Sequence, residues 1–152
     1  MAVQEIVGSV FLSDGILFVR DSLRANIGDP GSRGDPAQFI FTSYPKVSVK
    51  YPIITVKDSG ISNIRRLGMG CEQTAMDMAF EVRVWARNVK ERDILTQEVF
   101  YHLQSNQFGS GSETANVGLH DFNMSSMVNV DEPGEQGLKS KVMEYNYLYI
   151  NQ

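Results

Sequence analysis

The chain has 152 residues, of which 42% are apolar and 21% charged, and its formal net charge is −4. This composition excludes an intrinsically disordered chain and predicts a single domain, residues 1–152, with a core of its own. The negative charge argues against general affinity for a nucleic-acid backbone, and the single cysteine, Cys71, excludes an internal disulfide.

The sequence predicts no targeting or membrane segment. Its opening residues contain no basic stretch followed by a small-residue cleavage site. The longest uninterrupted apolar run, residues 16–19, is far too short to cross a bilayer. We therefore expect a soluble domain in a reducing compartment such as the cytoplasm.

A first helix is predicted at about residues 12–27. Ser13 or Asp14 is a candidate N-cap, and Gly28, followed by Asp29 and Pro30, ends the pattern. The apolar residues recur at spacings of three and four, which makes one stripe for the core: Leu12, Ile16, Val19, Leu23 and Ile27.

Residues 28–38 are dense in glycine, proline and aspartate, so they predict an exposed, flexible loop. Within it, Arg33, Gly34 and Asp35 spell a cell-adhesion tripeptide. We interpret this tripeptide as a turn, in which Gly34 supplies a positive φ angle and the Asp-Pro pair closes the turn.

Three short strands are predicted next, at residues 39–42, 46–50 and 53–58. A Tyr-Pro pair precedes the second and the third strand, at 44–45 and 51–52. Proline suits the first position of a strand and pushes the preceding residue into an extended conformation, so each pair predicts a strand start. The segment 46–50 has lysine at both ends, which is typical of a sheet edge; such an edge could also be completed by a partner.

The segment 59–70 continues as a β segment and a glycine turn, and residues 74–87 form the clearest strand. Apolar and polar residues alternate there with a strict period of two. The polar face ends in Trp85 between Arg83 and Arg87, a composition typical of interface hot spots. Two interpretations remain open: a subunit contact, or a Trp85 covered by a helix of the same chain.

A second helix is predicted at residues 89–108, chiefly 91–107, with Leu95, Val99 and Leu103 on its apolar side. A flexible loop at 108–116 follows, and then strands at 117–130 and 138–150. The last strand places three tyrosines on one face, either for the sheet core or for a neighbouring subunit: Tyr145, Tyr147 and Tyr149. The predicted fold is α+β, a mainly antiparallel or mixed sheet flanked by two principal helices.

The sequence contains no recognisable catalytic, metal-binding or cofactor-binding motif. There is no phosphate-binding loop and no nucleophile elbow. Cys71, His102 and His120 lack a metal-ligand spacing, and His120 with Asp121 is at most a possible pair. We therefore expect no cofactor, no metal and no enzymatic activity.

The order of these segments resembles the tail terminator and head–tail joining (neck) proteins of tailed bacterial or archaeal viruses. The likeness covers about residues 12–107 and is carried by the stretch 51–56, the strand 80–87, and Arg92-Asp93 at the start of the second helix. It implies a homo-oligomeric ring of about six subunits in the virion, assembled in the host cytoplasm. Such a ring caps the tail tube, joins it to the head connector and lets DNA pass without specific binding.

This resemblance assigns roles to two groups of residues. The candidate subunit interface comprises Arg83, Trp85, Arg87, Tyr145, Tyr147 and Tyr149. The candidate axial docking loops, which would face the tail tube and the connector, contain Arg33, Asp35, Phe108, Ser110 and Ser112.

Three alternatives remain open at the level of sequence. One is another head–tail connector component, such as a head-closure protein. Another is a small adaptor domain that binds a protein through its edge strand. The last is a small hydrolase that uses His120 and Asp121.

Overall fold

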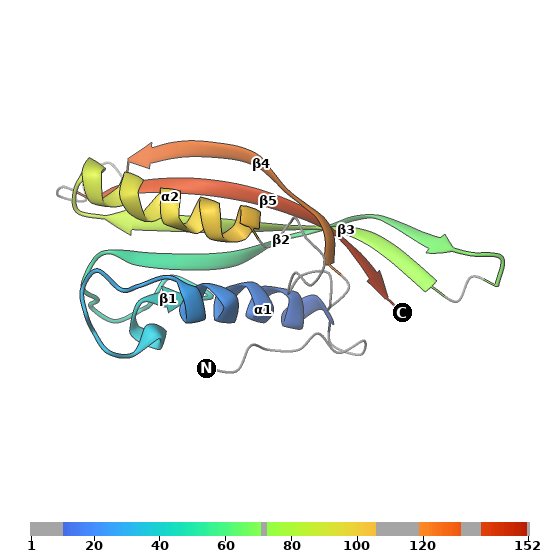
Figure 1. Cartoon of the computed structure of the whole chain (residues 1–152), viewed down its shortest axis with the longest axis horizontal. Helices are drawn as coiled ribbons and strands as arrows, with labels where there is room; N and C mark the ends of the chain where they lie inside the picture. The colour runs from blue at the N-terminus through green and yellow to red at the C-terminus, as the bar shows by residue number, and fades with distance from the viewer. Residues whose placement is uncertain (1–10, 71–72, 106–118, 132–137, 152) are drawn as a thin grey trace.

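The computed structural model describes residues 11–70, 73–105, 119–131 and 138–151. It confirms an α+β fold, in which one sheet carries two helices (Figure 1). The elements in chain order are α1 (Phe11–Asn26), the 3-10 helix η1 (Pro36–Gln38), β1 (Ile40–Phe41), β2 (Ile53–Leu67), β3 (Gln73–Ala86), α2 (Val89–Ser105), β4 (Leu119–Asp131) and β5 (Lys139–Asn151). None of the helices described is long and apolar enough to cross a membrane.

The five strands are ordered β1-β2-β3-β5-β4, with β3 in the middle. The short strand β1 runs parallel to β2, and the other three pairings are antiparallel. Phe80 of β3 pairs with Asp58 of β2 on one side and Tyr145 of β5 on the other. The sheet is therefore mixed, as the sequence predicts.

Both helices pack on the same face of the sheet (Figure 1). The alternation in β3 decides which face that is, because its even-numbered residues from Met76 to Ala86 are apolar and buried. The predicted apolar stripes of the two helices pack against these residues, and Leu23 of α1 and Val99 of α2 are fully buried. The opposite face of the sheet carries no helix in the part of the chain that the structure describes.

The strand predicted at residues 46–50 is wrong. Because β1 is parallel to β2, the chain must return from the end of Phe41 to the start of Ile53, and residues 42–52 form this connection. Pro45 consequently opens no strand, whereas Pro52 directly precedes β2 and follows a cis peptide bond.

The cap predicted for the first helix is also wrong, because α1 begins at Phe11 and both Ser13 and Asp14 lie inside it. The predicted positive φ of Gly34, by contrast, is confirmed at 79°.

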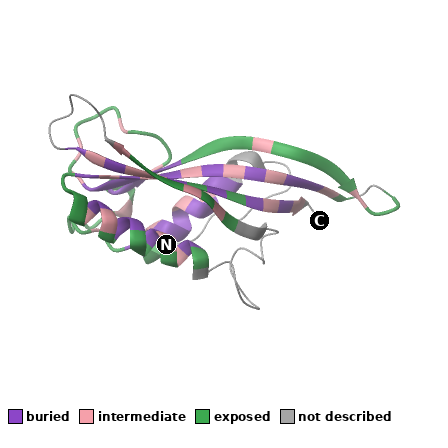
Figure 2. Ribbon diagram, turned by 90° about the horizontal axis from the view of Figure 1, so that it is seen from above, coloured by how far each residue is buried: buried purple, intermediate pink, exposed green. Residues whose placement is uncertain are grey.

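The β2–β3 hairpin projects beyond the helices at one end of the molecule (Figure 1). The pairing of β2 with β3 shifts register twice, between Asp58 and Gly60 and between Ser62 and Arg65. Bulges of this kind bend a strand and increase its twist. The projecting half of β2 is accordingly exposed at every residue from 57 to 66 except Ile61, as Figure 2 shows.

Candidate subunit-contact surfaces

Trp85 lies on the helix-free face of the sheet, where it is half-buried. The guanidinium carbon of Arg83 is 3.9 Å from the centroid of its ring, a cation–π contact. The Tyr44 ring meets it edge-on, with ring centroids 5.0 Å apart, and the indole Nε1 donates to Thr55 Oγ1 at 3.2 Å. Trp85 is thus partly covered by its own chain, through the 42–52 connection and not through a helix.

Polar contacts extend this arrangement across the sheet. Arg83 donates to Ser140 Oγ from Nη2 at 3.0 Å, and Ser140 in turn donates to the Val130 carbonyl of β4. At the other side, the hydroxyls of Tyr44 and Tyr51 are hydrogen-bonded to each other. We call Tyr44, Tyr51, Thr55, Arg83 and Trp85 the Trp85 cluster.

Only part of this cluster was predictable. The alternation in the strand 74–87 placed Arg83 and Trp85 on one face, as the structure has them. Tyr44 and Thr55 come from more than 25 residues earlier in the chain, so no local pattern marked them. Arg87 follows the end of β3, is exposed, and makes no ion pair with the described residues.

The three tyrosines of the last strand do not belong to a subunit surface, which corrects the predicted interface. Tyr145, Tyr147 and Tyr149 are only 2%, 2% and 4% exposed and pack in the core beneath the helices. Phe80 stacks on Tyr145 with ring centroids 5.2 Å apart. Burial raises the pKa of the Tyr145 and Tyr147 hydroxyls well above the usual tyrosine value. Sheet core is therefore the interpretation that the structure bears out.

Arg33, predicted as a docking residue, is engaged within its own chain. Its guanidinium donates to both carboxylate oxygens of Asp29 at 2.7 Å and to the carbonyls of Lys50 and Pro52. It also lies 5.1 Å from the centroid of the Phe39 ring. Arg33 thus ties the 28–38 segment to the start of β2.

Of the other predicted docking residues, only Asp35 lies within the described part of the chain. Asp35 is exposed and caps η1, because its Oδ1 accepts from the Ala37 amide at 2.9 Å. Phe108, Ser110 and Ser112 lie outside the described residues.

A surface that the sequence analysis did not single out lies at the end of the β2–β3 hairpin. We define the hairpin tip as residues 64–70. Ile64 is 69% exposed, Met69 is fully exposed, and Gly68 makes the turn with φ 80°. Arg65 and Arg66 are exposed and form no ion pair within the described part of the chain. The sequence signal was the pair of arginines between apolar residues just before a glycine turn.

The end of the molecule opposite the hairpin carries a groove of about 310 Å³ along the first turns of α2, the α2 groove. Ile94 is 50% exposed there and sits between Glu91 and Glu98 on successive turns of the helix. Neither Glu91 nor Glu98 forms an ion pair with a described residue. The remaining lining residues are Pro30, Asn88, Lys90 and Leu95.

The described residues contain no group of three or more histidine, cysteine, aspartate or glutamate side chains that could hold a metal ion. His102 of α2 lies 2.9 Å from Ser22 Oγ of α1, atom Nε2 to atom Oγ, so this histidine links the two helices. Cys71 and the side chains of His120 and Asp121 lie outside the described part.

Comparison with known proteins adds no family to this picture: no protein-family model matches the chain, and no curated protein is similar to it.

Proposed function

We propose that this protein is a virion structural subunit, a tail terminator or neck protein that assembles into a ring at the head-proximal end of a viral tail. The observation that carries the proposal is the projecting β2–β3 hairpin. Its tip exposes Ile64 and Met69, which cover no core residue of the part of the chain that the structure describes. Exposed apolar side chains that are grouped in one patch mark sites of contact with another molecule.

A closed ring of identical subunits supplies the second argument. Such a ring is joined head to tail, so each subunit needs two different contact surfaces. Three candidate surfaces of different chemistry lie on different parts of the chain: the hairpin tip, the Trp85 cluster and the α2 groove. The resemblance of residues 12–107 to tail terminators agrees with this requirement, and the expected partners are further copies of the chain, the tail tube protein and the connector.

The charge of the chain suits a channel for DNA. With a net charge of −4, the subunit has no general attraction for the phosphate backbone. We therefore expect DNA to pass through the ring without being held.

The test is light scattering coupled to size exclusion over a concentration series, with negative-stain images of each peak, alone and with purified tail tubes. Rings of about six subunits with a central hole, or caps on tube ends, support the proposal. Rings of another size that bind the connector but not the tube would indicate a head-closure protein. A chain that forms neither rings nor tube caps at any concentration would sink the proposal.

An adaptor domain is a second candidate, favoured by the free edge of β4. This strand runs from Leu119 to Asp131, and no described strand pairs with its outer side. An edge of this length can accept an added strand from a peptide. A one-to-one complex between a monomeric chain and an extended peptide would favour the adaptor over the ring subunit.

A further inference from the structure

We infer that the hairpin tip of one copy docks in the α2 groove of the next copy, so that this pair of surfaces forms the head-to-tail contact. The inference rests on the proposed function in one respect: the occupant of the groove is a second copy of this chain. It goes further by assigning the two contacting surfaces.

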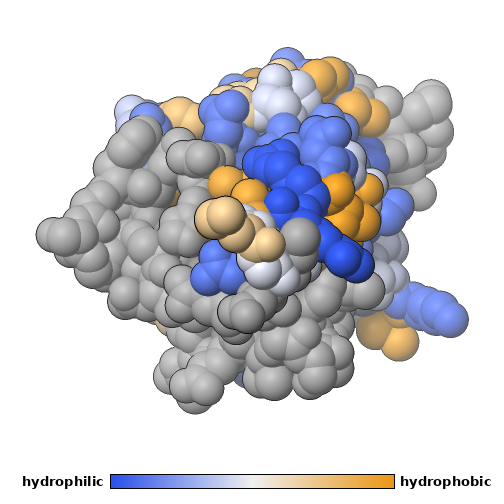
Figure 3. All heavy atoms as spheres, turned by 90° about the vertical axis from the view of Figure 1, so that its right-hand side faces the viewer, coloured by the Kyte–Doolittle hydropathy of each residue, from blue (hydrophilic) through white to orange (hydrophobic). Residues whose placement is uncertain are grey.

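The first step is the chemistry of the tip. Residues 64–70 contain two arginines, no acidic residue and three large apolar side chains. Met69 stands at the far end on a flexible, unbranched side chain, which adapts well to an irregular apolar surface. Figure 3 views the molecule from this end and shows strongly hydrophilic side chains beside hydrophobic ones.

The second step is the chemistry of the groove. Its floor is apolar, formed by the half-exposed Ile94 and the buried Leu95. Glu91 and Glu98 border this floor, with Lys90 as the only basic residue of the lining. An apolar floor with a predominantly acidic border matches an apolar tip flanked by Arg65 and Arg66.

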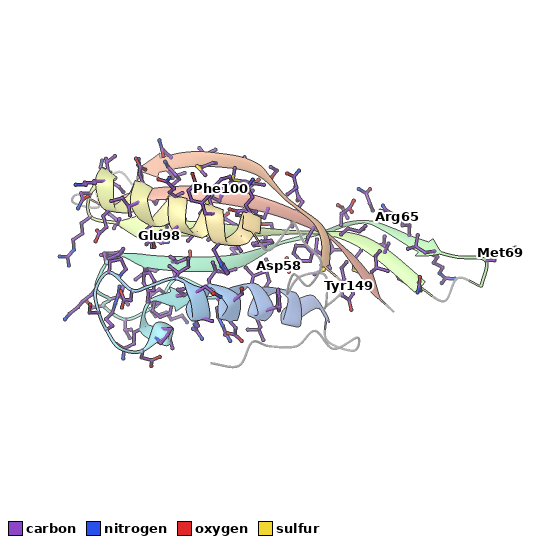
Figure 4. All side chains as sticks on the ribbon, viewed as in Figure 1. Asp58, Arg65, Met69, Glu98, Phe100 and Tyr149 are labelled. Atoms are coloured by element: carbon purple, nitrogen blue, oxygen red, sulfur yellow. The ribbon has the colours of Figure 1, made fainter. Side chains whose placement is uncertain are left out.

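The third step is placement. Met69 lies at one end of the long axis of the molecule, and Glu98 lies toward the other end (Figure 4). Two complementary surfaces at opposite ends cannot meet within one copy. They can meet between successive copies, and a repeated contact of this kind generates a ring if the rotation closes and an open chain if it does not.

Charge complementarity selects a second copy as the occupant. The arginines of the tip and the glutamates of the groove make no ion pairs in the described part of their own chain, so both sets are available for pairing. Opposite charges bordering an apolar contact set orientation and speed association. The two surfaces are also present at equal concentration in any solution of the protein.

Cross-linking of mixed variants tests the contact. One variant carries Met69→Cys and Cys71→Ser, and the other carries Ile94→Cys and Cys71→Ser. A short bis-maleimide should join the two in the mixture and should not join either variant to itself. A matched control replaces Ile94→Cys by Gln104→Cys, an exposed position near the far end of the same helix. We expect about tenfold more cross-linked dimer with Ile94→Cys than with the control, since docking raises the local concentration of the two thiols.

Charge reversal provides a second readout. Arg65→Glu with Arg66→Glu should weaken self-association about tenfold, and so should Glu91→Lys with Glu98→Lys. A chain that carries both the arginine and the glutamate reversals should regain self-association. The control for the arginine reversal is Lys46→Glu with Lys50→Glu, at two exposed lysines of the 42–52 connection. It changes the net charge by the same amount and sign as the arginine reversal and should leave self-association unchanged.

The outcomes separate this inference from the proposed function. Rings that form without a cross-link between positions 69 and 94, or that ignore the charge reversals, overturn the inference and leave the ring proposal standing. Open chains that show the cross-link and the charge rescue support the inference and count against the ring. A chain that stays monomeric, forms no caps on tail tubes and cross-links at neither position overturns both.

Discussion

Gly15 lies where α1 comes close to the sheet. A Cβ atom at this position would lie 2.5 Å from Tyr147 Oη, much nearer than carbon and oxygen tolerate. Tyr147 is 2% exposed and packs against Phe80, so its ring has no free space into which to retreat. Glycine is therefore required here by packing and not by backbone conformation.

We expect Gly15→Ala to lower the free energy of unfolding by about 1–2 kcal/mol, although alanine is the better helix former, because overpacking outweighs helix propensity. Urea denaturation monitored by circular dichroism measures this change. Gly28→Ala is the control, since a Cβ at Gly28 meets nothing within 4 Å. Combining Gly15→Ala with Tyr147→Phe should cost less than the sum of the single changes, and simple additivity would contradict the clash.

Asp29 and Arg33 form the ion pair that holds the 28–38 segment. Hydrogen bonds from the Arg33 guanidinium lower the pKa of the Asp29 carboxyl below its ordinary value of 3.8. A carboxyl group with a lowered pKa in the folded state stabilises the fold above its unfolded pKa. That contribution is lost as the pH falls below about 4.

Asp29→Asn should therefore reduce the free energy of unfolding at pH 7 by about 1–3 kcal/mol, the usual contribution of a charge-assisted hydrogen bond. The difference in unfolding free energy between variant and wild type, the stability gap, should narrow as the pH is lowered from 5 to 3, about the range in which an aspartate titrates. Denaturant titrations at each pH measure this gap. A gap that stays constant over that range would show that the charge of Asp29 plays no part.

At the scale of elements, β3 organises the molecule, because it pairs along most of its length with β2 and β5. Its period of two sends Phe80, Val82 and Val84 toward the helices, and Arg83 and Trp85 to the open face. One strand thus builds both the core and the Trp85 cluster. A substitution on the open face should disturb assembly more than it disturbs the fold.

We expect Trp85→Ala to weaken ring assembly by at least about 2 kcal/mol, as truncation of an aromatic hot spot does. The unfolding free energy of the dissociated subunit should fall by about 1 kcal/mol, because Trp85 is only half-buried. Light scattering and urea denaturation give the two numbers. Trp85→Phe should retain much of the free energy of assembly. If Trp85→Ala lowers the free energies of assembly and of unfolding by the same amount, Trp85 serves the fold alone.

At the scale of the whole molecule, a basic, apolar tip and an acidic, apolar groove lie at opposite ends of one long body (Figure 4). This polarity gives each copy a head and a tail. The proposed head-to-tail contact therefore predicts assembly in one direction, because two tips repel each other through their arginines, and so do two grooves through their glutamates.

Self-association should weaken as the ionic strength rises, because salt screens exposed charge pairs. Between about 50 mM and 500 mM salt we expect the dissociation constant to rise about tenfold, and sedimentation velocity measures it. The variant with Arg65→Glu and Arg66→Glu should lose this salt dependence or invert it. An association that strengthens with salt in the wild type would indicate a purely apolar contact.

Much of the fold was predictable where a periodic pattern extended over several turns or residues. The stripe containing Val19 and Leu23 predicted the carboxyl end of α1 to within one residue, and the alternation in the strand 74–87 predicted β3. The strand at 46–50 was not predictable in the same way. A strand exists only if a partner lies beside it, and the parallel pairing of β1 and β2 left this segment as a connection.

The sequence by itself determined which residues share a face, since side-chain direction follows from local backbone geometry and recurs with a fixed period. It placed Tyr145, Tyr147 and Tyr149 together, and Arg83 with Trp85. Only the tertiary structure decided what covers each face: the helices cover the tyrosines, and Tyr44 partly covers Trp85. The projecting hairpin and the α2 groove were likewise settled by tertiary structure. Both depend on how segments far apart in the chain are brought together, such as Pro30 and α2, which line the groove together, and no local pattern records that arrangement.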